Sequence, residues 1–470
     1  MGPHTRLSRR RVLASLCALA GSVAGCTGDG SEDRTTPSRT RTAAPTATTA
    51  QPTDTTTDER TPLIDAIDGE AVPFDPGAAP EGLDAVAARL SRSRIVGIGE
   101  NSHGVSEFKT IEHRLIRRLV ADHGYRLIAM EGTLGDFGPV DRYVAGEDVD
   151  LDTAMASTEF YFWRTGPIRR LFEWLRAFNA DRPAADRVVV RGYDAQFFDV
   201  NATAVRSYLS RVDPTYLDGV HDRLTPLTRP LYERHDADLS TEARRDLLDS
   251  LGERLRSHRD AYVAETSTAE WRLARRHVWT LERGLRFQEA LRAERYTQGK
   301  RVRDAAMAAN VAWLRDWTGA DRAAVVGSTN HTMRNDGVGA DEAARMGQHL
   351  TDEFGDDYYS LGCLFGTGRF AAPADPDRTA FETHDLDGPV PGTLAATLVA
   401  AEHSPLFLDF EAARDRAPIE TLLADTSKVG VSVPRAANRG AIPLPAAPEA
   451  VYDGVAFVRD VTPASFASGE

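Results

Sequence analysis

Short apolar runs separated by amphipathic segments recur along this chain, and this alternation limits its fold more than any other feature. Apolar residues from Val105 to Val120 recur at helical spacing before Gly124, and residues 168–178 show the same pattern. Strands that are buried on both faces and alternate with helices are typical of parallel sheets. The sequence therefore predicts an α/β fold with a mainly parallel central sheet flanked by helices. The predicted strands occupy residues 95–99, 127–131, 188–193, 323–327, 358–364, 406–408 and 455–457.

The stretch from about residue 201 to 318 shows no strand pattern. Within it, Leu273, Val278 and Leu285 recur at helical spacing among arginines and glutamates. A chain of 470 residues is long enough to add such a segment to a large α/β domain. We expect a helical insertion or cap.

Residues 1–25 have the layout of an export signal. Arg9 and Arg10 stand before the uncharged stretch 12–24, which is too short for a bilayer core that needs about 20 residues. The paired arginines resemble a twin-arginine signal, and the small residues before Cys26 resemble a lipobox. We therefore expect an exported protein, held on the outer face of the cytoplasmic membrane by a lipid on Cys26. A simple cleaved signal with a chance cysteine is the alternative.

Residues 26–62 differ in composition from the rest of the chain. They are rich in threonine and proline and contain little that a core could bury. Such a composition predicts a disordered stalk. The folded domain is expected to cover residues 63–470.

Acidic residues outnumber basic ones by 70 to 56, which gives a formal net charge of −14. This charge repels phosphate backbones, so no nucleic-acid partner is expected. Lysine occurs only at positions 109, 300 and 428, and arginine supplies nearly all the positive charge. This profile favours a halophilic, archaeal source, with a GC-rich mesophile as the alternative. Cys17, Cys26 and Cys363 provide no disulfide framework for the folded domain.

Ionisable residues follow four of the predicted strands. Ligands of open α/β sheets bind outside the carboxyl ends of the strands, so these positions are the first candidates for chemistry. Glu100 and His103 lie three residues apart in a glycine-flanked turn, where a carboxylate can orient an imidazole for proton transfer. Glu131 ends the second strand and His331 follows the fourth. We expect these four side chains to surround one substrate.

Other chemistries find less support in the sequence. The Gly-x-Ser-x-Gly motif of a serine nucleophile is absent, and Cys363 lies inside an apolar run, which favours direct attack by water. The glycines at 97 and 99 do not complete a dinucleotide fingerprint, and no cofactor is expected. The four candidate residues are competent metal ligands, but no His-Glu-x-x-His or Cys-x-x-Cys spacing is present. We expect no metal, and a metal-dependent hydrolase on the same residues remains an alternative.

The segment Ile98-Gly99-Glu100-Asn101-Ser102-His103-Gly104-Val105-Ser106-Glu107-Phe108 resembles a signature of the erythromycin esterase family. Further blocks in family order are Arg114-Leu115-Ile116, Ala129-Met130-Glu131, Gly192-Tyr193-Asp194-Ala195-Gln196, Arg303-Asp304-Ala305-Ala306-Met307-Ala308-Ala309-Asn310 and Asn330-His331. One departure is Ser102, which stands where the family usually has threonine. The resemblance implies hydrolysis of a macrolide lactone ester without a serine nucleophile.

The resemblance also implies roles for single residues. His103 would be the general base for water, Glu100 and Glu131 would orient and tune it, and His331 would bind or polarise the substrate. The supporting positions that it implies are Glu107, Arg114, Asp194, Arg303, Asp304 and Asn310, of which the last three would hold the helical part against the site.

The expected partner is a small-molecule ester or lactone. The competing class is an extracytoplasmic solute-binding lipoprotein, because such proteins share the lipobox and the stalk. They usually comprise two similar α/β lobes, and their sites do not need paired histidine and glutamate.

Overall fold

The computed structural model describes residues 61–467, apart from residues 76, 78–79, 230–238, 336–342, 375–379, 387, 433–440 and 445. A nine-stranded sheet lies at its centre, in the order β1-β8-β11-β6-β2-β5-β3-β4, with β7 paired to the end of β6. The neighbours from β11 to β4 run parallel, whereas the pairs β1–β8, β8–β11 and β6–β7 are antiparallel. The fold is a mixed, mostly parallel α/β fold, as predicted.

The strands of this sheet are β1 (Val72–Pro73), β2 (Ile95–Glu100), β3 (Leu127–Thr133), β4 (Val189–Asp194), β5 (Ala323–Ser328), β6 (Tyr358–Pro373), β7 (Phe381–Leu386), β8 (Leu406–Asp409) and β11 (Gly454–Val461). A separate hairpin pairs β9 (Val429–Ser432) with β10 (Ala441–Leu444). The seven predicted strands are confirmed.

Helices cover both faces of the sheet. One face carries α3 (Asp84–Leu90), α4 (Ser106–His123), α5 (Gly138–Val144), α6 (Leu151–Ala156) and α7 (Gly166–Asn179). The other carries α13 (Tyr296–Thr318), α14 (Thr329–Thr332) and α15 (Met346–Phe354). The antiparallel end of the sheet packs with α2 (Pro62–Glu70), α16 (Leu394–Leu398), α17 (Phe410–Ala413), α18 (Ala417–Ala424) and α19 (Pro448–Val451).

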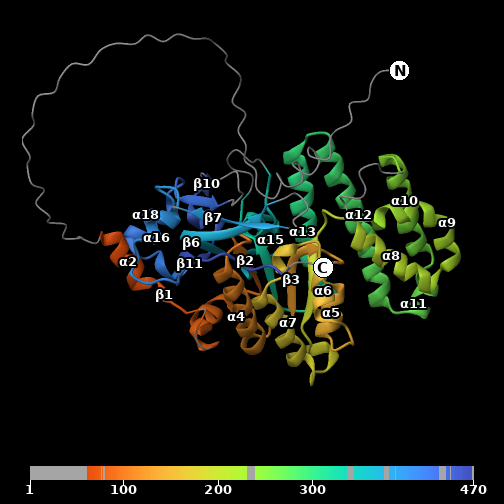
Figure 1. Cartoon of the computed structure of the whole chain (residues 1–470), viewed down its shortest axis with the longest axis horizontal. Helices are drawn as coiled ribbons and strands as arrows, with labels where there is room; N and C mark the ends of the chain where they lie inside the picture. Colours follow the sequence, from red (N-terminus) through yellow and green to blue (C-terminus); the bar gives the residue numbers. More distant parts are fainter. Residues whose placement is uncertain are drawn as a thin grey trace, which may run out of the picture.

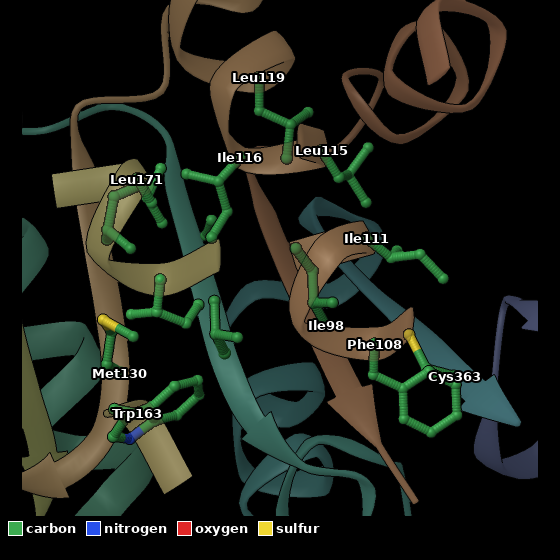
Figure 2. Close-up of a cluster of buried hydrophobic side chains, with 14 of the residues drawn as sticks. Ile98, Phe108, Ile111, Leu115, Ile116, Leu119, Met130, Trp163, Leu171 and Cys363 are labelled. Atoms are coloured by element: carbon green, nitrogen blue, oxygen red, sulfur yellow. The ribbon is translucent and has the colours of Figure 1, made fainter. Parts of the chain in front are cut away.

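Helix α4 forms the largest part of the core on its face. Its apolar residues lie at helical spacing and are buried, and Gly124 ends the helix in a left-handed conformation. Figure 2 shows this face, where Ile111, Leu115 and Ile116 lie over the sheet near Ile98 of β2. Because the N-terminus of α4 follows directly on the loop after β2, packing of this helix fixes the loop that carries His103.

Between β4 and β5, the described residues form helices and no strand. These are α8 (Asp199–Val212), α9 (Pro214–Leu224), α10 (Thr241–Ser257), α11 (Arg259–Glu265), α12 (Thr268–Arg292) and α13. All but α13 share a core of their own with Leu209, Leu251 and Leu281, and Figure 1 shows them at one end of the molecule, away from α2, α16 and α18. The limits expected for the helical insertion, at about residues 201 and 318, stay a prediction.

Four strands were not expected from the sequence, namely β1, β7, β9 and β10. β1 has two residues and β7 is largely exposed, so neither produces a clear apolar run. β6 extends nine residues beyond its predicted end, because its second half pairs with β7 and β11. The predicted signal, Cys26 and most of the stalk lie outside the described residues. Within the part of the chain that the structure describes, no helix is long and apolar enough to cross a membrane.

The loop after β2 generates a prediction about stability. A Cβ on Gly104 would overlap the backbone carbonyl of Ala371, which cannot move without breaking the sheet. We expect Gly104→Ala to lower the free energy of unfolding by about 1–3 kcal/mol. The control is Gly69→Ala in α2, where nothing lies within 4 Å and alanine favours the helix. Urea denaturation of both variants checks this, and equal stability would contradict the close packing of the loop.

Candidate active site

The carboxyl ends of three adjacent parallel strands bring the first candidate residues together. Glu100 ends β2 in register with Ser328 at the end of β5, and the Ser328 amide donates to Glu131 Oε2 of β3 at 2.7 Å. Both glutamates are buried. Glu100, Glu131 and the helix that carries His331 therefore lie together at the carboxyl ends of the strands.

His103 and Glu100 form a close pair. His103 Nδ1 lies 2.6 Å from Glu100 Oε1, and the imidazole stacks on the Phe162 ring with centroids 3.8 Å apart. The carboxylate is fully buried, whereas 23% of the histidine side chain is exposed. A carboxylate at Nδ1 favours the proton on that nitrogen and leaves Nε2 as the basic nitrogen of the neutral ring. The imidazole is thus oriented and can be reached from outside.

Two residues of α4 complete what we call the Glu100 cluster: Glu100, His103, Lys109 and Glu112. Lys109 Nζ donates to Glu100 Oε1 at 2.7 Å and to Glu112 Oε2 at 3.3 Å, and it lies 4.2 Å from the centroid of the Trp163 ring. No role was predicted from the sequence for Lys109 or Glu112. One signal was present, because Lys109 is one of only three lysines in the chain.

Burial shifts the acid–base equilibria of this cluster. Loss of solvation raises the pKa of Glu100 to about 7, against the opposing charge of Lys109. Burial and the negative charge of Glu100 raise the pKa of Glu112 well above its usual range. Burial opposes the charge on Lys109, but the two glutamates outweigh it and raise its pKa. The ammonium group therefore stays charged.

A second group, the Arg303 cluster, comprises Glu131, Asp194, Arg303, Asp304 and His331. Arg303 Nη2 donates to Asp194 Oδ2 at 2.7 Å and to Glu131 Oε1 at 3.4 Å, which ties α13 to β4 and β3. His331 lies between two acids, with Nδ1 at 2.8 Å from Asp304 Oδ1 and Nε2 at 3.7 Å from Glu131 Oε1.

Charge neutralisation explains how this cluster tolerates burial. Desolvation opposes ionisation of Asp304, but the positive charges of His331, Arg345 and Arg303 outweigh it and lower the pKa of that carboxyl. Burial also opposes the charge on Arg303, and Asp194 and Glu131 overcome it, so that the pKa of the guanidinium is raised.

Trp163 connects the two clusters. Its ring covers Lys109, and its Nε1 donates to the backbone oxygen of Glu131 at 2.7 Å. The negative charge of Glu131 also contributes to the raised pKa of Glu100. The two clusters therefore both contact Trp163, and Glu131 acts on Glu100 electrostatically.

Three of the supporting candidates lie outside both clusters. Glu107 accepts hydrogen bonds from the amide and hydroxyl of Thr462, and so anchors the C-terminal segment. Arg114 donates to the Gly77 carbonyl at 3.4 Å. Asn310 donates to the Tyr193 carbonyl at 2.9 Å, which joins α13 to β4. Of these three, only Asn310 has the geometry for holding the helical part against the sheet.

Other possible reactive groups are limited. Burial raises the pKa of the Cys363 thiol well above its ordinary value. Ser102 Oγ accepts a hydrogen bond from the Gly104 amide, and Ser102 is buried. Among the residues that the structure describes, no three or more histidine, cysteine, aspartate or glutamate side chains are arranged to hold a metal ion.

The sequence is similar to proteins that carry hydrolase or esterase names. The chain is 22% identical over 374 residues to "Putative hydrolase YbfO" of Bacillus subtilis (strain 168), which covers 73% of this chain and 80% of the relative. It is 27% identical over 105 residues to erythromycin esterase type II of Escherichia coli, which covers 22% of this chain and 24% of that protein.

Solved structures share the fold. A Bacillus cereus protein superimposes with a TM-score of 0.70 at 19% identity and covers 86% of this chain and 98% of its own. A succinoglycan biosynthesis protein gives a TM-score of 0.69 at 17% identity, covering 86% and 97%. A mutant of the erythromycin esterase EreC in its open conformation gives 0.62 at 15% identity, covering 84% and 97%.

The family model described as erythromycin esterase matches residues 120–461. Glu100 and His103 precede the matched residues, whereas Glu131, Asp194, Arg303 and His331 lie within them. Because this match covers well over half of the chain, the chain belongs to the erythromycin esterase family.

Proposed function

We propose that this protein hydrolyses an ester or lactone by direct attack of water, with His103 as the general base. The observation that carries the proposal is the His103–Glu100 pair, in which a buried carboxylate holds Nδ1 at 2.6 Å while the imidazole is partly exposed. Histidine is suited to proton transfer near neutral pH. The family and a relative named as a hydrolase support the reaction class.

In this mechanism, His103 Nε2 takes a proton from water as the water oxygen attacks the carbonyl carbon. The imidazolium that forms lies against Glu100, whose negative charge stabilises it. His331, whose Nδ1 contacts Asp304 and whose Nε2 faces Glu131, is assigned to bind or polarise the carbonyl oxygen of the substrate. Breaking the carbon–oxygen bond then releases the alcohol, which recovers the proton from His103.

The substrate class is an expectation from the family. Two relatives carry the name erythromycin esterase, and a macrolide is therefore one candidate among small esters and lactones. A panel of aryl esters and lactones, assayed at high salt because of the acidic composition, tests the class. Specific hydrolysis of any member supports the proposal, and binding without turnover across the panel contradicts it.

Substitution of His103 tests the base directly. Removal of a positioned base costs about 10²–10⁴-fold in rate, so we expect His103→Ala to lose activity by that factor. The control is His221→Ala on the exposed surface of α9. Steady-state kinetics on the best ester of the panel, with circular dichroism to check folding, provides the measurement. Activity of His103→Ala equal to that of the control would rule out the proposed role.

Chelation tests the metal-dependent alternative. We expect dialysis against EDTA to leave activity unchanged, because the proposed nucleophile is activated by an imidazole alone. The measurement is the rate before dialysis, after dialysis and after addition of Zn²⁺, Mn²⁺ or Mg²⁺. Loss of activity that a divalent ion restores would transfer the role of His103 to a metal-bound water.

We further propose that the protein is exported and lipid-anchored. The support is the order of Arg9, Arg10, the apolar stretch 12–24 and Cys26 in the sequence. Replacing both arginines by lysine should retain the protein inside the cell, and Cys26→Ala should release it from membranes. Cell fractionation with immunodetection checks both variants, and unchanged membrane association in each would contradict the proposal.

A further inference from the structure

The Glu100 cluster places two buried carboxyl groups against one ammonium group. Lys109 Nζ lies 2.7 Å from Glu100 Oε1 and 3.3 Å from Glu112 Oε2, and none of the three side chains is more than 1% exposed. Water cannot solvate a charge at such a depth, and an uncompensated buried charge is costly. One lysine balances one carboxylate, so ionisation of both glutamates would leave a buried negative charge without compensation.

The remaining carboxyl oxygens indicate where a proton lies. Glu100 Oε2 and Glu112 Oε1 are buried and receive no hydrogen bond from an N–H or hydroxyl donor within the described ranges. The other oxygen of each carboxyl group lies against the same Lys109 ammonium group, so the two carboxyl groups are neighbours. Two carboxylates can only accept, whereas a carboxylic acid donates to a carboxylate. A proton between the two groups therefore satisfies both.

We propose that Glu112 is a positioning residue that remains a neutral acid and donates its proton to Glu100. Glu100 then keeps one negative charge, which Lys109 and His103 share through the same oxygen, Oε1. When His103 takes a proton from water, the proton of Glu112 stays in its hydrogen bond, and the new positive charge lies beside Glu100. This consequence for catalysis rests on the proposed function; the protonation of Glu112 does not.

The other titratable groups that face Glu100 are consistent with this assignment. Glu131 on β3 adds negative charge and disfavours a second carboxylate, and the Cys363 thiol on β6 is held neutral by burial. Burial raises the pKa of Glu100 to about 7 and that of Glu112 well above its usual range. Both shifts favour a retained proton on this pair, and the geometry assigns the negative charge to Glu100, which contacts His103 and is closer to Lys109 than Glu112 is.

Infrared spectroscopy of the full chain at pH 8 tests the protonation without a substrate. A protonated carboxyl absorbs at a frequency distinct from that of a carboxylate, and the difference spectrum of wild type minus Glu112→Gln isolates this residue from other buried acids. We expect a protonated-carboxyl band in that difference. The matched control is Glu107→Gln on the same helix, where the side chain accepts from Thr462 and the difference should contain carboxylate bands. A carboxylate band for Glu112 overturns the proposal.

Lys109→Met provides a second, independent readout. Without the ammonium group, Glu100 should become protonated, and the spectrum should gain a protonated-carboxyl band. If hydrolysis is the function, loss of the Glu100 charge should also move the acidic limb of the kcat/KM profile to lower pH by about 1–3 pH units. If the spectrum gains no protonated-carboxyl band and the acidic limb of the kcat/KM profile does not move, Lys109 does not keep Glu100 ionised. If this variant does not fold, the Glu112→Gln difference spectrum still decides the proposal.

The two proposals can fail separately. The infrared bands do not depend on turnover, so a protein that hydrolyses no ester can still show a protonated Glu112. Conversely, an active hydrolase whose Glu112 is ionised would retain the proposed function and refute the positioning role.

Discussion

A single carboxylate oxygen, Oε1 of Glu100, holds together the residues that we propose for catalysis. It contacts the Lys109 ammonium group from α4 and the His103 imidazole from the loop after β2. Burial makes these interactions strong, because each polar group has few alternatives to its protein partner. The same burial restricts the charge of the cluster, so position and protonation of His103 depend on one residue at the end of one strand.

The sheet and its helices hold this arrangement from two sides. On one face, α4 packs its apolar residues on β2 and delivers Lys109 and Glu112 beneath the loop. On the other, Arg303 of α13 binds Asp194 and Glu131 and so fixes the edge near His331. The long helical segment between β4 and β5 is therefore joined to the chemical region through buried ion pairs as well as through packing.

Much of this structure could be predicted from the sequence, for identifiable reasons. The buried strands form uninterrupted apolar runs. The residues at or just after their carboxyl ends, Glu100, Glu131 and His331, could therefore be named as candidates. The edge strand β1 and the exposed strand β7 carry no such run, because few of their residues face a core. Glu107 lies in the same signature as Glu100 and His103, yet its position on the first turn of α4 directs it to Thr462.

The buried pair of Lys109 and Glu112 could not be found by strand-end reasoning. Both residues belong to a helix, and their spacing of three is typical of an exposed ion pair on a helix surface. Only the tertiary structure shows that this face of α4 meets Glu100 and Cys363 instead of solvent. The charge state of the site therefore depends on packing that local sequence patterns do not report.

The most direct test of the account is the tautomer of His103 in the resting protein. Nitrogen NMR of histidine-labelled protein, with the resonances assigned by their loss in His103→Ala, distinguishes a proton on Nδ1 from one on Nε2. We expect the neutral ring to carry its proton on Nδ1, toward Glu100, and Nε2 to be the nitrogen that accepts the second proton. A neutral ring protonated on Nε2 would contradict the assignment of His103 as the general base.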